Sequence, residues 1–454
     1  MNHERIEAWI AQTKTRHSRS PPFAPGIKPD AMENILNPSS PPHSDVYLID
    51  DLDRTPRNGH SPKRRRFQAI EYLSHRQRPI TEGTPSLHDT SSVTRSTRST
   101  RTGTTGARKS KGSRSPVKSV SDLRLSEKPV ESLELDSFDQ LPSDVAALFA
   151  QVKRVCCGDG IVPQSIKGDF LSSLTPRDMG YSDASFYDAG QWATSVGLRP
   201  WRADRELEVL SKVVTNTKEC KRESFSEAAW NSRVHEPLLD FVLDCFAGQV
   251  RHYDVTRAAI DKAYIPSLEV GVDMQAKMVD YCLTLAGDDI MSSAKKRNKA
   301  NRSVSINHTS YEPVRDRPIA VNIETKAPGS SNSEAEAQLS VWTLAHLKRL
   351  RSLACTSNST LTIDVTIPVI YVCGGEWHLY FVRDRADKME MIEACPIGDT
   401  RTLVGCYKVA TFLRHLGIWI RLVYRDWALR NVLTVGSVST VQDPPAADGA
   451  VFDT

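Results

Sequence analysis

The chain has 454 residues, of which 39% are hydrophobic and 25% charged, and its formal net charge is +4. Residues 1–130 carry 23 Lys and Arg against 13 Asp and Glu, so residues 131–454 sum to about −6. That balance counts against a large basic DNA-binding face on the folded part. There is no signal-like leader and no apolar run near the ~20 residues of a membrane span, so we expect a nuclear or cytoplasmic protein that is not secreted.

The N-terminal region is rich in Ser, Thr, Arg and Pro. Between Ser91 and Ser119 there are eight basic residues and no acidic one. Such a segment cannot bury enough apolar area to offset the loss of chain entropy on folding. We therefore predict a disordered tail over 1–130, one folded domain over 131–435 and a second disordered tail over 436–454.

The first half of the predicted domain is helical. Apolar residues recur at helical spacing over 144–155, 204–217 and 226–246. Ser143 is placed to cap the first helix and Ser226 the third. Pro237 lies inside the third segment, and because proline has no backbone N–H it predicts a kink or a break there.

The second half alternates strands and helices. Strand candidates are 277–285, 318–323, 361–373 and 377–382, and Gly374-Gly375 predicts a hairpin between the last two. We expect a polar loop over 286–317 and helices over 333–353, 403–416 and 419–433, with Ser333 capping the first of these helices. This order predicts an α/β fold with a mixed central sheet flanked by helices.

Two strand candidates carry acids at positions that suit one site. Asp280 lies in the first strand candidate, Glu324 ends the second, and Lys326 follows two residues later. Residues i and i+2 of a strand point to the same face, so Glu324 and Lys326 project together. If the strand of Asp280 lies alongside, two carboxylates face each other and need a cation between them. Mg²⁺ or Mn²⁺, which prefers oxygen ligands, is the cofactor that this pattern predicts.

Four segments together resemble the nuclease-like domain of a fungal family of the PD-(D/E)XK type. They are Glu227-Ala-Ala-Trp230-Asn231 with Val234-His235, then Met278-Val279-Asp280-Tyr281, then Ile323-Glu324-Thr325-Lys326, and finally Glu336-Ala-Gln338 with Trp342. The resemblance covers about 130–433 and implies a restriction-endonuclease-like core. It does not extend to the N-terminal tail.

The resemblance also implies roles for individual residues. Asp280, Glu324 and Lys326 match the D…E-x-K positions, Glu227 matches the helical acid and Gln338 the helical glutamine. Asp280, Glu324 and Thr325 would contact the metal ion. The implied activity is metal-dependent hydrolysis of phosphodiester bonds in nucleic acid, either DNA or RNA. The alternative is a catalytically inactive nuclease-like fold that binds nucleic acid or protein.

Several features leave a second interpretation open. An E-x-K triplet alone is common and usually marks an ion pair on a surface strand. Asp273 competes with Asp280 for the first acidic position, because no proline precedes Asp280. For His235 we favour a hydrogen-bonded core histidine over a metal ligand. The segment around Tyr424-Arg425-Asp426 resembles a protein-kinase catalytic loop but lacks the His and the D-F-G motif, so it predicts a packing helix.

Nuclear import is predicted from one short segment of the tail. Ser61-Pro62-Lys63-Arg64-Arg65-Arg66 is a basic cluster of the kind that import receptors recognise. Replacing residues 63–66 with alanine should shift a fluorescently tagged protein from the nucleus toward the cytosol. An unchanged distribution would contradict the assignment.

Overall fold

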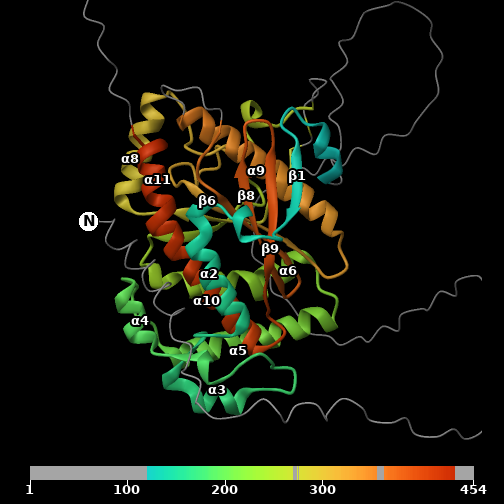
Figure 1. Ribbon diagram of the computed structural model, residues 1–454, viewed down its shortest axis with the longest axis vertical. Coiled ribbons are helices and arrows are strands. Elements are labelled where there is room, and N and C mark those ends of the chain that lie inside the picture. Colours follow the sequence, from blue (N-terminus) through green and yellow to red (C-terminus); the bar gives the residue numbers. More distant parts are fainter. Residues whose placement is uncertain (1–119, 269–273, 275, 355–361, 435–454) are drawn as a thin grey trace, which may run out of the picture. The chain divides into compact units, whose positions relative to one another are not determined.

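The computed structural model describes residues 120–268, 274, 276–354 and 362–434 (Figure 1). The basic cluster at 63–66, Asp273 and the segment 436–454 lie outside the described residues. Within the described part no helix is long and apolar enough to cross a membrane.

A seven-stranded sheet forms the centre of the fold, in the order β1-β9-β8-β7-β6-β5-β4. The pairs β1–β9 and β6–β7 are parallel and the other four pairs are antiparallel, which confirms the predicted mixed sheet. The seven strands have these bounds: β1 Val130–Glu134, β4 Val250–Asp254, β5 Tyr281–Leu285, β6 Ile319–Lys326, β7 Ile367–Cys373, β8 Glu376–Asp384 and β9 Met389–Asp399. Two short strands, β2 Val162–Pro163 and β3 Phe186–Tyr187, pair separately.

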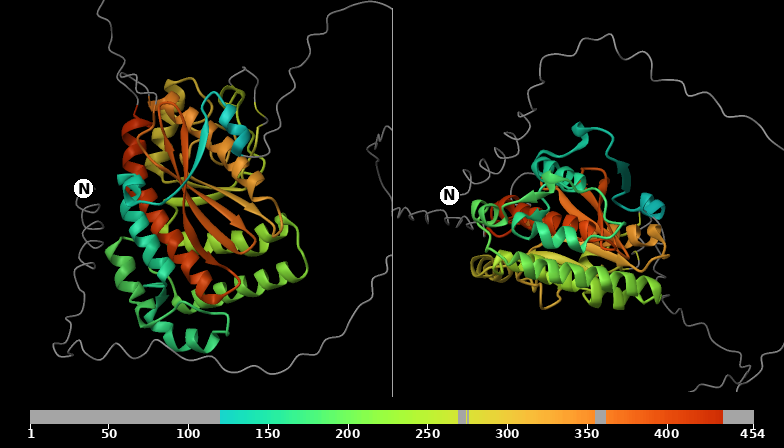
Figure 2. Two further views of the ribbon diagram at one scale, coloured as in Figure 1. Left: turned by 45° about the vertical axis from the view of Figure 1, so that its right-hand side comes forward. Right: turned by 90° about the horizontal axis from the view of Figure 1, so that it is seen from below.

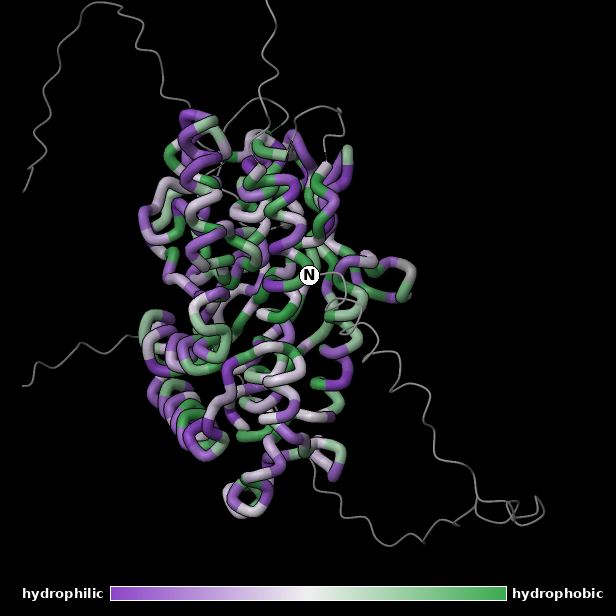
Figure 3. Tube along the Cα trace, turned by 90° about the vertical axis from the view of Figure 1, so that its left-hand side faces the viewer, coloured by the Kyte–Doolittle hydropathy of each residue, from purple (hydrophilic) through white to green (hydrophobic). Residues whose placement is uncertain are grey.

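Helices flank this sheet (Figures 1 and 2). Hydrophilic and hydrophobic residues alternate along the outer helices in Figure 3, as expected of helices that pack by one face. The α-helices are α2 Ser143–Cys157, α3 Lys167–Ser173, α4 Ala189–Ser195, α5 Ala203–Arg222, α6 Glu227–Trp230, α7 Glu236–Leu243, α8 Asp288–Ala300, α9 Asn332–Ala354, α10 Leu403–Trp419 and α11 Arg425–Asn431. Two π-helical turns, Asn231–His235 and Ile420–Tyr424, join neighbouring helices.

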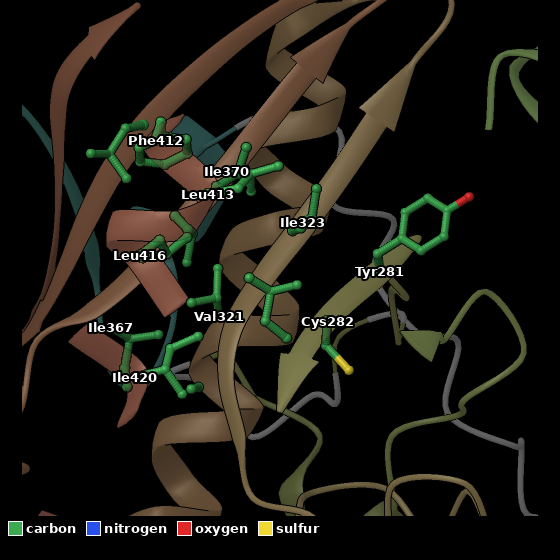
Figure 4. Close-up of a cluster of buried hydrophobic side chains, with 14 of the residues drawn as sticks. Tyr281, Cys282, Val321, Ile323, Ile367, Ile370, Phe412, Leu413, Leu416 and Ile420 are labelled. Atoms are coloured by element: carbon green, nitrogen blue, oxygen red, sulfur yellow. The ribbon is translucent and has the colours of Figure 1, made fainter. Parts of the chain in front are cut away.

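The inner strand β6, between β7 and β5, is buried along its whole length and separates two packed layers. Figure 4 shows Val321 and Ile323 of β6 in one apolar cluster with Leu413 and Leu416 of α10. The alternate residue Asn322 faces the opposite side, where Trp342 Nε1 of α9 donates to its Oδ1 at 3.0 Å. Burial on both faces explains the continuous apolar run that marks this strand in the sequence.

Three local expectations were wrong. The segment predicted as a polar loop contains helix α8, whose buried face is short: Ile290, Ala294, Arg297 and Asn298. Helix α2 begins at Ser143 itself, with Pro142 at the N-cap and no side-chain cap. The backbone N of Glu334 in α9 donates to Ser331 Oγ at 3.4 Å, so Ser331, and not Ser333, lies at the capping position of this helix.

A π turn precedes the proline in the third predicted helix. Glu236 N donates to Asn231 O, five residues earlier, which is the π-helical hydrogen bond. Pro237 has no N–H, so the carbonyl of Arg233, four residues earlier, loses its helical donor. Asn216 of α5 replaces that donor, because its Nδ2 lies 2.7 Å from Arg233 O. The helix therefore continues past the proline, and a π turn stands where the sequence predicted a kink or a break.

The segment that resembles a kinase loop is a packing helix, as expected. It forms the end of the second π turn and all of α11. Tyr424, Trp427 and Ala428 are buried in the core. Arg425 makes an ion pair with Asp289 of α8, with 2.6 Å between Nη2 and Oδ2.

We expect Asn216→Ala to lower the free energy of unfolding by about 1–2 kcal/mol, because it leaves the partly buried Arg233 carbonyl without a donor. Urea unfolding measures the change. The neighbouring Thr215 is exposed on the same helix, and Thr215→Ala should stay within about 0.5 kcal/mol of wild type. Equal losses for the two variants would contradict this account of the π turn.

Candidate active site

The pairing of β5 with β6 brings the two predicted acids to the same end of the sheet. Tyr281 pairs with Ile323 in an antiparallel register, so Asp280, one residue before β5, lies beside Glu324 near the end of β6. Both side chains are buried, at 7% and 1% exposure. The adjacent-strand arrangement that the site requires is therefore present.

Asp280 is held by hydrogen bonds from two residues. Thr325 N donates to Asp280 Oδ2 at 2.9 Å, and Thr325 Oγ1, which has a single proton, lies 2.9 Å from the same oxygen. Asn231 Nδ2 donates to Asp280 Oδ1 at 3.3 Å, and Asn231 Oδ1 accepts from Thr325 Oγ1 at 2.7 Å. These contacts fix the orientation of the carboxylate relative to β6.

Lys326 makes three contacts with its ammonium group. It pairs with Glu324 Oε1 on the same strand face, lies 3.1 Å from the Thr325 carbonyl oxygen and lies 3.4 Å from Glu227 Oε2. An ammonium group has three donors, so each one has an acceptor here. The E-x-K triplet is thus a buried ion pair rather than the exposed one that such triplets usually form. Glu227 of α6 joins it from outside the sheet.

The burial of these carboxylates changes their acidity. Burial raises the pKa of Glu324 to about 8, the charge on Asp280 adds to that shift and Lys326 opposes it. Burial also raises the pKa of Asp280, although the hydrogen bonds from Thr325 lower it. Burial raises the pKa of Glu227 as well, and there the charge on Lys326 opposes the shift. Burial lowers the pKa of Lys326, but Glu324 outweighs it and the pKa lies above its usual value.

One helix face carries the supporting residues. Glu227, Asn231 and His235 lie at intervals of four, and they reach Lys326, Asp280 and the Gly374 carbonyl respectively. The sequence alone predicted no role for Asn231, which was noted only as part of a motif. The signal was present as a polar stripe of period four beside the apolar stripe of the same helix.

His235 is a core residue, as favoured. Its ring is fully buried and stacks on Trp230 with 6.2 Å between centroids. Its Nδ1 lies 2.9 Å from Asn231 Oδ1, and its Nε2 lies 2.8 Å from Gly374 O. Burial lowers its pKa to about 4, although the contact with Gly374 opposes that shift. His235 therefore supports Asn231 and the hairpin turn.

Gln338 lies at the edge of this group. Its Nε2 donates to the Met278 carbonyl at 3.3 Å, two residues before Asp280. It therefore contacts the backbone that leads into β5, and the structure gives it no hydrogen bond to either carboxylate.

The donor set suits a hard divalent cation. Glu324 Oε2 is buried without a hydrogen-bond partner, an acceptor that a cation would satisfy. Among the described residues, no three His, Cys, Asp or Glu side chains gather closely enough to hold a metal. Carboxylate oxygens and water are ligands typical of Mg²⁺, and Asp280 and Glu324 are the residues here that would hold such an ion.

Comparison with known proteins gives one match. A family model described as the PD-(D/E)XK nuclease superfamily matches residues 174–425, more than half of the chain. The matched part contains all of the site residues described above. No curated protein matches the chain.

The buried carboxylates make a prediction about pH. A glutamate with a folded pKa of about 8 binds its proton more tightly than in the unfolded chain, where its pKa is about 4.3. Its contribution to stability therefore falls as pH rises from about 4.5 to 8. Without metal, Glu324→Gln should match wild type near pH 4.5 and be more stable at pH 8, by up to about 5 kcal/mol for pKa values about 3.7 apart at ~1.4 kcal/mol per pKa unit.

Thermal unfolding in EDTA across this pH range measures the difference. Glu134→Gln, at an exposed position of β1, is the matched control and should show no such trend. A gap between Glu324→Gln and wild type that widened toward acid pH would contradict the assignment of a raised pKa.

Proposed function

The chain belongs to the PD-(D/E)XK nuclease superfamily, and on that basis we propose that it hydrolyses phosphodiester bonds of nucleic acid with a divalent metal ion. The observation that carries the proposal is the pair of buried carboxylates, Asp280 and Glu324, on adjacent strands with the ammonium of Lys326 beside them. A buried acid pair raises the energy of the folded state unless a cation joins it.

Each residue has a distinct role in this proposal. Asp280, Glu324 and the Thr325 carbonyl hold the metal, which when bound polarises a phosphoryl oxygen and lowers the pKa of water at the site. Lys326 orients the attacking water and offsets the negative charge that develops on the phosphoryl oxygens. Glu227 keeps Lys326 charged and in place, as the 3.4 Å contact and the raised pKa of Lys326 support.

Asn231 and Gln338 act by positioning. Asn231 donates to Asp280 and accepts from Thr325, so it sets the carboxylate and β6 relative to each other. Gln338 contacts the backbone two residues before Asp280. Neither residue is assigned a direct part in the reaction.

Substitutions should separate metal binding from turnover. Lys326→Met should leave metal binding intact and lower kcat by about 10²–10⁴-fold, because it removes a charge near the reacting water and no ligand. Asp280→Asn and Glu324→Gln should lose both metal binding and cleavage. Calorimetry with Mg²⁺ and Mn²⁺ measures binding, and plasmid DNA, single-stranded DNA and single-stranded RNA measure cleavage.

Lys299→Met, an exposed lysine of α8, is the control and should cleave as wild type does. If wild type binds nucleic acid but hydrolyses none of these substrates with either metal, the nuclease proposal is wrong. The chain would then be a nuclease-like module that binds without cleaving.

A further inference from the structure

A second feature of the fold is a basic cavity of about 570 Å³. Five of its seven lining residues are basic and none is acidic. It lies between the loop after α3, the last turns of α5 and the segment after β9, and α3 and α5 appear at the same end of the fold in Figure 1. The lining residues are Thr175, Pro176, Arg177, Lys218, Lys221, Arg222 and Arg401.

Three of these cations have no acidic partner among the described residues: Arg177, Lys218 and Lys221. Arg401 pairs with Asp399 and Glu376, and Arg222 pairs with Glu223. The dipole of α5 favours a basic residue such as Lys221 near its C-terminus, but it does not account for Arg177, which another segment carries. These three like charges converge without an acidic partner, on a domain (131–435) whose net charge is about −3. The cavity is therefore suited to an anion.

The walls of the cavity are fixed by buried contacts. Asp178, next to Arg177, is buried and accepts from Thr175 N at 2.9 Å and from Val404 N at 3.0 Å. Thr217, next to Lys218, lies 2.9 Å from Thr400 between the two Oγ1 atoms. The loop, α5 and the segment after β9 are thereby tied together, so the cations are presented on a pre-formed surface.

The cavity is connected to the proposed active site through the β7–β8 hairpin. Gly374 N donates to Lys326 O at 2.7 Å, and Thr400 N donates to Gly375 O at 2.9 Å. The path from Lys326 to Arg401 crosses two such hydrogen-bonded pairs, each ~5 Å wide, and takes two steps along the chain of ~3.8 Å. The Cα atoms of Lys326 and Arg401 are therefore at most roughly 18 Å apart. A nucleic-acid strand, with one phosphate per ~3.4 Å of helix axis, spans that distance in a few nucleotides.

Exposed apolar side chains lie just beyond the loop that carries Arg177. Met179 is 77% exposed and Tyr181 is 41% exposed. Basic groups beside exposed apolar or aromatic surface are typical of sites that hold a nucleic-acid backbone while bases stack alongside. A small phosphate ligand would leave this surface unused.

We propose that this cavity binds backbone phosphates of the nucleic-acid strand a few nucleotides from the bond held at Glu324 and Lys326. The proposal rests on the nuclease function proposed above and adds a second grip on the same substrate. It also explains how a domain of negative net charge binds a polyanion: the attraction is concentrated in one cavity rather than spread over a face.

The test compares two triple variants with the same change in charge. The cavity variant carries Arg177→Ala, Lys218→Ala and Lys221→Ala. The control carries Lys295→Ala, Lys296→Ala and Lys299→Ala, three exposed lysines of α8 without ion pairs in the described structure. Thermal unfolding verifies the fold of both, and the single variant Lys218→Ala serves if the cavity variant is unstable.

Binding is measured by fluorescence anisotropy in EDTA, with labelled 20-nucleotide DNA and RNA as single strands and duplexes. The cavity variant should bind at least tenfold more weakly, and the slope of log affinity against log salt should fall by about 2–3 units for three lost contacts. The control should stay within about twofold of wild type. Equal losses in both variants, or no loss in the cavity variant, would overturn the proposal.

Two further arms separate the possible failures. In cleavage assays the cavity variant should have a raised KM on the 20-nucleotide substrate, but unchanged rates on bis(4-nitrophenyl) phosphate, which is too short to reach the cavity. Wild type that cleaves both, with an unchanged KM in the variant, would overturn the cavity and spare the nuclease. Wild type that neither binds nor cleaves nucleic acid would overturn both. Calorimetric binding of inorganic pyrophosphate with unchanged nucleic-acid affinity would assign the cavity to a small ligand instead.

Discussion

Two carboxylates buried at one end of adjacent strands are the constraint on which the rest of the site depends. Asp280 and Glu324 each lose hydration, which raises the pKa of both, and the charge on Asp280 raises the pKa of Glu324 further. The protein offsets this cost unequally: hydrogen bonds from Thr325 and Asn231 surround Asp280, whereas Glu324 has the ammonium of Lys326 on one oxygen and no partner on the other. That asymmetry leaves Glu324 as the acid with most to gain from a cation.

The π turn explains how one helix serves both acids. A regular helix with proline at position 237 would lose the hydrogen bond to Arg233 and bend. The π turn and the amide of Asn216 avoid this, and the helix face with Glu227, Asn231 and His235 runs unbroken past the ends of β6 and β7. π turns often occur at functional sites because they shift the helical register locally. Here the shifted residues are those that contact Asp280 and the hairpin.

The sequence predicted the fold class and the neighbouring strands of Asp280 and Glu324, but it missed several elements around them. Glu324 and Lys326 could be identified from the sequence, because charged residues at the end of a fully buried strand interrupt a strong apolar pattern. Strand β9 and helix α8 escaped prediction for opposite reasons. β9 is interrupted by Glu393, Pro396 and Gly398 and is stabilised by pairing with the preceding strand β8 and with the distant strand β1. Helix α8 buries one narrow stripe under a polar surface. Asn231 was missed because the polar stripe to which it belongs does not identify its partners, which are 49 and 94 residues away.

The hairpin turn Gly374-Gly375 joins the separate parts of this end of the sheet. Gly374 has a positive φ of 57°, and a Cβ there would lie 2.7 Å from Pro328, while a Cβ on Gly375 would lie 2.6 Å from Asp399 Oδ1. Only glycine allows both approaches. Through this turn Lys326, His235 and Thr400 contact one backbone segment. Backbone hydrogen bonds therefore fix the position of the acid pair relative to the basic cavity. These two regions have opposite charge, so a single polyanionic strand can contact both only if their separation is fixed.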